Sequence, residues 1–180
     1  MPFAYYHRLN RQQRRVYRCS DNIRLIQLPA LWQTAPLPQN LERVLKLEDR
    51  SEVEIVCQQI FNGLARALKV PAAKVTVYAV RPSGRWGELH GLYTPGNVGK
   101  PAHVEIWMRT ARRRQVVAFR TFLRTLMHEL CHHLDYALLK LPESFHTEGF
   151  YQRETGLLNQ LVPKDASGIS SPATGQKQQV

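Results

Sequence analysis

An H-E-x-x-H motif at residues 128–132 gives this chain the residue types and the spacing of a zinc site. His128 and His132 are four positions apart, so on a helix they lie one turn from each other and can bind the same ion. Glu129 is placed to accept a proton from metal-bound water. His146 follows after a short break and would be the third protein ligand, which leaves one position for water, as in catalytic zinc sites. We therefore expect one Zn²⁺ per chain.

The third ligand has rivals. Glu148 and Glu154 follow His146 closely, and some zinc peptidases use a glutamate in this place. Asp135 is interpreted as a residue that orients a ligand histidine from outside the ligand set, or as a plain surface carboxylate, and His133 as a structural residue. A further donor for the oxyanion is expected near the metal, and the candidates are Tyr151, Tyr93 and His103.

The motif lies within a segment that has the periodicity of an amphipathic helix. Apolar residues recur every three or four positions, at Val116, Phe119, Leu123, Leu126, Leu130, Leu134, Ala137 and Leu141. At about 100° per residue they form one stripe, and His128 and His132 lie on roughly the opposite side. This pattern predicts a helix over 116–141 that packs into a core and presents its histidine pair to a cleft. Pro142 should end it.

A second helix is predicted over 147–161, capped by Ser144 or Thr147. The short turn between the two helices should make them neighbours and bring the third ligand over the first helix. Further upstream, the pattern predicts a short strand over 23–28, a helix over 51–70 with Ser51 as its N-cap, and strands over 74–80, 89–93 and 102–109. We expect the strand over 102–109 to lie at a sheet edge and to pair with an extended substrate.

Together the motif and the histidine that follows it resemble the zinc-binding core of the SprT/Spartan-like metallopeptidases. Members of that family carry an H-E-x-x-H helix and then a third zinc histidine, followed four residues later by an aromatic residue, here Phe150. The resemblance covers roughly residues 51–161. It implies an α+β, minimal zincin-like domain: a helix, a small antiparallel or mixed sheet, the active-site helix and a second helix carrying the third ligand. It also implies a zinc peptidase, and in some members the cleavage of proteins attached to DNA.

Composition favours one globular domain with tails. We expect a basic extension at residues 1–40, the metallopeptidase domain at 41–162 and a disordered tail at 163–180. The three cysteines, Cys19, Cys57 and Cys131, form no disulfide framework, so a cytoplasmic protein is expected. No apolar run is long enough for a membrane span.

Positive charge is concentrated in two places, and the net charge is +11. The first twenty residues contain five arginines with three tyrosines among them, and a second cluster precedes the predicted active helix: Arg109, Arg112, Arg113 and Arg114. Such clusters suit contact with DNA or another polyanion. The leading hypothesis is a zinc metalloendopeptidase acting on protein or peptide substrates. The alternatives are a nucleic-acid-associated zinc protein without proteolytic activity and a metal-dependent amidase acting on small substrates.

Overall fold

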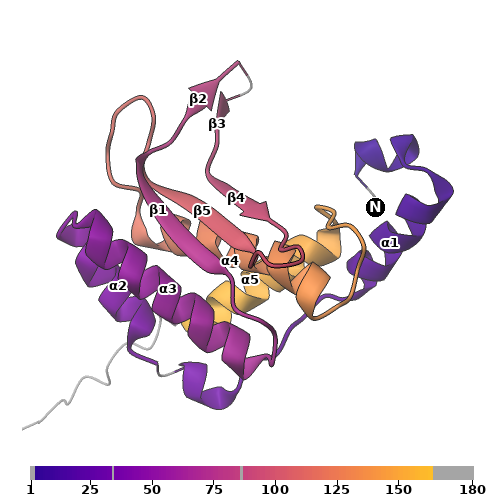
Figure 1. Cartoon of the computed structure of the whole chain (residues 1–180), viewed down its shortest axis with the longest axis horizontal. Coiled ribbons are helices and arrows are strands. Elements are labelled where there is room, and N and C mark those ends of the chain that lie inside the picture. The colour runs from indigo at the N-terminus through magenta and orange to yellow at the C-terminus, as the bar shows by residue number, and fades with distance from the viewer. Residues whose placement is uncertain (1–2, 34, 86, 164–180) are drawn as a thin grey trace, which may run out of the picture.

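The chain folds as an α+β structure in which helices cover one face of a small sheet (Figure 1). The computed structural model describes residues 3–33, 35–85 and 87–163. Within them, no helix has both the length and the apolar character that a membrane span requires. The elements in chain order are η1 (Ala4–Arg8), α1 (Arg11–Asn22), η2 (Ala30–Gln33), α2 (Leu37–Lys46), α3 (Arg50–Ala67), β1 (Lys74–Val80), β2 (Ser83–Gly84), β3 (Gly87–Glu88), β4 (Gly91–Thr94), β5 (His103–Arg109), α4 (Phe119–Ala137) and α5 (Glu148–Leu161).

The main sheet is mixed and has the order β1-β5-β4. Strand β5 pairs in parallel with β1 and antiparallel with β4. The expectation that the strand over 102–109 lies at an edge is therefore wrong, because the glycine-rich connection after β1 folds back as β4 along the outer side of β5. The edge strand nearest the H-E-x-x-H helix is β4, which packs directly against α4.

One face of the sheet is buried and the other is largely open. Alternate side chains of the two long strands point into the core: Val75, Val77, Val104, Ile106 and Met108. On the opposite face Tyr78 and Trp107 stack with their ring centroids 5.7 Å apart. Helices α3 and α4 pack on the sheet, and α2 packs against both of them. The sheet thus serves as a wall for the helix that carries the motif.

Helix α4 confirms the predicted stripe but is shorter than expected. Its leucines at the stripe positions are fully buried: Leu123, Leu126, Leu130 and Leu134. The helix begins only at Phe119, because Val116 forms a β-bridge with Arg109. It ends at Ala137, and Lys140 then adopts a left-handed backbone with φ 55°.

The caps of α3 and α5 follow local hydrogen bonding. Thr147 caps α5, as predicted, and its hydroxyl accepts from the backbone N–H of Phe150 at 2.9 Å. Ser51 is not the cap of α3. Asp49 is, since its carboxylate accepts from the N–H groups of Ser51 and Glu52. A carboxylate also suits the positive end of the helix dipole.

The first forty residues contribute to the core. Ile26, Leu28 and Trp32 are buried members of the main hydrophobic cluster, although the predicted strand over 23–28 does not form. Helix α1 packs against α5, on the side of the molecule away from α2 and α3 (Figure 1). Of the predicted disordered tail, residues 164–180 lie outside the described part of the chain.

Candidate metal centre

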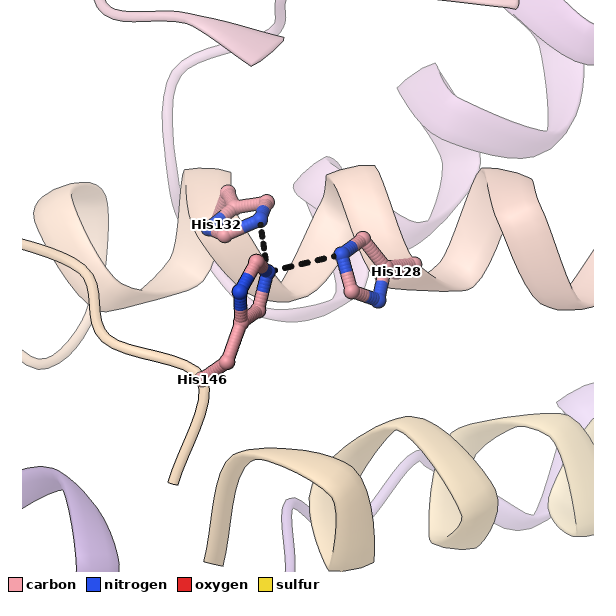
Figure 2. A group of neighbouring side chains, drawn as sticks. All are labelled: His128, His132 and His146. Carbon is pink, nitrogen blue, oxygen red and sulfur yellow. Dashed lines mark hydrogen bonds between the residues drawn. The ribbon is translucent and has the colours of Figure 1, made fainter. Parts of the chain in front are cut away.

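Three histidines converge on one point beside α4 (Figure 2). The Nε2 atom of His146 lies 3.0 Å from Nε2 of His128 and 3.1 Å from Nε2 of His132. His128 and His132 are presented by consecutive turns of α4. His146 comes from the segment just before α5 rather than from that helix, which corrects the expected placement of the third ligand on the second helix.

The outer nitrogen of His128, which is the ring nitrogen that points away from the other two histidines, faces a carboxylate. Its Nδ1 lies 2.9 Å from Oε2 of Glu154, a side chain that is almost completely buried. A carboxylate can only accept, so Nδ1 carries the hydrogen and Nε2 keeps its lone pair. The other oxygen of Glu154 accepts from Arg124 at 2.8 Å. Glu154 therefore orients a histidine instead of replacing His146 in the group.

The outer nitrogen of His132 is held in a similar way through a hydroxyl. Its Nδ1 lies 2.7 Å from Oγ of Ser144, and this hydroxyl donates to Oδ2 of Asp135 at 2.6 Å. Because its proton goes to Asp135, the Ser144 oxygen must accept from Nδ1–H of His132. The Nε2 atom of His132 is consequently also left with a lone pair. Burial, followed by the charges of His128 and His146, lowers the pKa of His132 to about 3, which keeps the ring neutral.

The donor set fits a zinc ion. The Nε2 lone pairs of His128 and His132 both point at Nε2 of His146. That nitrogen can offer only one hydrogen or one lone pair in its ring plane, so it cannot hydrogen-bond to both of them. A cation among the three nitrogens can accept from all of them. Zn–N bonds of about 2.0–2.1 Å in a tetrahedral site separate ligand nitrogens by about 3.4 Å, close to the 3.0 and 3.1 Å between Nε2 of His146 and those of the other two histidines. Glu148 and Glu154 are not members of the group.

Glu129 lies next to the triad and against the edge strand. Its side chain is 4% exposed, and a Cβ atom built on Gly91 of β4 would lie only 2.2 Å from its Oε1 atom. Burial raises the pKa of the Glu129 carboxyl to about 7; the charge of His128 opposes this shift and that of Glu154 adds to it. A carboxyl with such a pKa can both accept and release a proton near neutral pH.

Hollows lie on both sides of this carboxyl. One, of about 340 Å³, is lined by all three histidines and by residues 91–93 of β4. The other, of about 420 Å³, extends past Arg124, Thr125 and His90. Gly91, His128 and Glu129 line both hollows, so the two together form a groove that runs alongside β4 and across the histidine triad.

The three candidates for the oxyanion donor lie at different places relative to the triad. Tyr151 lies beside the triad, with its ring stacked on His146 at a centroid distance of 5.8 Å. Tyr93 lies near the triad, but its hydroxyl is bonded to Nδ1 of His133 at 3.1 Å. His103 is bonded to Thr76 on the sheet.

The arginine cluster before α4 is not brought to the metal centre. Arg109 pairs with Glu48 at 2.6 Å. Arg112, Arg113 and Arg114 lie in the exposed turn that follows β5. None of the four lines either hollow. Their predicted contact with substrate or nucleic acid stays a prediction.

Sequence reasoning missed two contributors to the site. Ser144 was considered only as a helix cap, and Gly91 only as a residue of the predicted strand over 89–93. The signal for Ser144 was its position two residues before the third histidine.

The structure establishes three histidines that can hold a metal ion, in an arrangement compatible with an H-E-x-x-H zinc site. In comparisons with known protein families, with curated proteins and with solved structures, the chain has no match.

Proposed function

We propose that the protein is a zinc-dependent endopeptidase that hydrolyses peptide bonds in protein substrates. The observation that carries this proposal is the convergence of His128, His132 and His146 beside a buried Glu129, in a groove along a strand edge. When bound there, zinc supplies a Lewis acid that polarises a carbonyl and lowers the pKa of water. The resemblance of the motif to the SprT/Spartan-like peptidases supports the same reaction.

Glu129 acts as the proton carrier in this proposal. Its carboxylate accepts a proton from the attacking water and then delivers it to the departing amine. Burial, which raises the pKa of this carboxyl, makes it a better proton acceptor than an exposed carboxylate. Asp135 holds His132 in its required tautomer through Ser144. Tyr93, which lines the hollow of the triad, and Tyr151, whose ring stacks on His146, stay candidate donors to the oxyanion.

The substrate is proposed to bind as an added strand along β4. This strand pairs on one side with β5, and no strand of the described residues pairs with its other edge, which can therefore accept a partner. Gly91 brings this edge against the carboxyl of Glu129. An extended peptide paired with β4 would therefore pass the histidine triad. This replaces the strand over 102–109, which lies in the centre of the sheet.

The test compares the wild type with Glu129→Gln. We expect about one zinc per wild-type chain, cleavage of fluorescently labelled casein, and loss of cleavage with a chelator. The variant should keep its zinc, because glutamine leaves the ligands in place, and should lose at least about 10²-fold in kcat. Cleavage by the variant at the wild-type rate would overturn the assigned role of Glu129. A wild type without zinc would overturn the proposal itself.

A second candidate function, nucleic-acid association without proteolysis, is favoured by one observation. A hollow of about 470 Å³ on α1 is lined by Leu9 and four arginines: Arg11, Arg14, Arg15 and Arg18. Within the described chain none of these arginines is paired with a carboxylate. Binding of a single-stranded oligonucleotide that weakens steeply with salt, with no cleavage of casein, would favour this candidate.

A further inference from the structure

The third ligand is held from outside the helices that surround it. His146 lies in the stretch between α4 and α5, so regular helical hydrogen bonds do not fix its backbone. If the backbone of such a segment is not already ordered, metal binding must order it, and the lost conformational entropy weakens the binding. Helix α4 holds this stretch through the bonds of Ser144 to His132 and Asp135. Further contacts that order it come from the N-terminal segment, residues 3–23, and Figure 1 shows α1 of this segment beside α5.

Tyr5 contacts the ligand residue itself. Its hydroxyl donates to the backbone oxygen of His146 at 2.8 Å, across 141 positions of sequence. The ring of Tyr5 packs edge-on against Tyr17 at a centroid distance of 5.9 Å. Tyr17 is 1% exposed and also lies against Phe145, the residue before the ligand. The backbone N–H of Phe3 donates to the Tyr17 hydroxyl at 3.0 Å, which fixes the start of this segment.

Helix α1 contacts the same stretch on both sides of His146. Before it, the Gln13 amide donates to Glu143 at 3.0 Å. After it, the backbone N–H of Gly149 donates to the Asp21 carboxylate at 3.0 Å. A Cβ atom at Gly149 would lie 2.3 Å from the backbone oxygen of Asp21, so α5 begins in direct contact with the end of α1. The stretch is therefore held at each end and in the middle.

The end of α1 is also connected to His132. The buried guanidinium of Arg153 donates to the backbone oxygens of Ser20 and Ile23, and to Asp135 at 2.7 Å. Asp135 accepts from Ser144, whose oxygen accepts from His132. A continuous line of hydrogen bonds thus runs from the last turn of α1 to the outer nitrogen of a second ligand.

We propose that the N-terminal segment is a positioning element of the metal centre, and that Tyr5 is the positioning residue for His146. This inference rests on the proposed zinc site. It assigns residues 3–23 to the site itself, where the sequence suggested only a basic extension. Removing the Tyr5 hydroxyl releases the backbone of His146, so metal binding must then order that backbone at a cost in affinity.

The test uses the full chain with Tyr5→Phe, and Tyr6→Phe as the matched control. The Tyr6 hydroxyl lies in the same short helix, but it accepts from Arg18 and does not contact the ligand segment. Zinc affinity is measured by competition with a chromogenic chelator, and ligand geometry from the visible absorption bands of the Co²⁺-loaded protein. We expect Tyr5→Phe to weaken zinc binding about three- to tenfold, as loss of one neutral hydrogen bond does. It should also change the Co²⁺ spectrum, while Tyr6→Phe changes neither.

The outcomes separate this inference from the proposed function. A wild type that binds zinc, together with equal affinities and identical Co²⁺ spectra for both variants, would overturn the positioning role alone. A wild type that binds no zinc would overturn both proposals. A purely structural role for Tyr5 would lower the thermal unfolding midpoint of the metal-free protein and leave the Co²⁺ spectrum unchanged, which also contradicts the inference.

Discussion

Replacing Gly91 with alanine should slow hydrolysis without removing zinc. Gly91 lies on the edge strand β4, where a Cβ atom would meet three atoms of the Glu129 side chain, at 2.2, 2.8 and 2.9 Å. Its backbone is not in the left-handed region, so alanine itself fits the strand. The end of the Glu129 side chain can rotate away, and we therefore expect the fold to survive while the carboxyl group moves.

The size of the displacement follows from these contacts. To go from 2.2 Å to the 3.4 Å at which ordinary contact begins, the Glu129 oxygen must move by about 1.2 Å. A misplacement of about 1 Å in a reacting group costs on the order of 10²-fold in rate. The three atoms nearest to the new methyl group all belong to Glu129, and none of them is a ligand nitrogen. We therefore expect kcat to fall about 10²-fold at unchanged zinc content.

The assay is cleavage of labelled casein by zinc-loaded protein, with zinc content measured on the same sample. Gly84→Ala is the matched control, because a Cβ atom there meets nothing within 4 Å and the residue also lies in a short strand. A Gly91→Ala variant that retains the wild-type kcat would show that the position of Glu129 does not govern the reaction. Loss of zinc from this variant would contradict the stated geometry.

Three further predictions concern the supports of the site and the hydrophobic core. Glu154→Ala removes the acceptor of His128, and zinc affinity, measured by chelator competition, should fall roughly ten- to hundredfold. Asp135→Ala leaves Arg153 buried without its carboxylate partner, so urea unfolding should show a loss of about 3–5 kcal/mol. Trp32→Ala should cost about 3–5 kcal/mol in the same measurement, whereas no change would mean that this residue lies outside the core.

The features that sequence could predict are those that depend on local periodicity. The spacing of apolar residues around the motif already determines which side of α4 enters the core, and the leucines of that stripe are fully buried. The same pattern places His128 and His132 on the open side. Thr147, one of the two residues predicted as a possible cap, is the N-cap of α5, and it could be proposed because capping involves only the next three residues. The triad followed from these local features and a short connection.

Strand order could not be predicted, because it depends on pairing between distant segments. The pattern predicts a short strand over 89–93, close to the observed Gly91–Thr94, but it does not show that this strand forms the edge of the groove. The strand over 102–109 was assigned to the edge because it is the last strand before the active helix. The N-terminal residues were missed for the same reason: Tyr5 and Tyr17 look like part of a basic tail until the fold brings them to His146.

Neighbouring imidazoles on α4 illustrate why the outer nitrogen decides which histidine can bind metal. His133 donates from Nε2 to the backbone oxygen of Pro71 at 2.8 Å and accepts at Nδ1 from the Tyr93 hydroxyl, so both of its nitrogens are used within the protein. His132 directs only Nδ1 to a partner, the Ser144 hydroxyl, and its Nε2 lone pair faces the other ligands. The sequence shows two adjacent histidines, whereas the hydrogen-bond partners make one of them structural and the other a ligand.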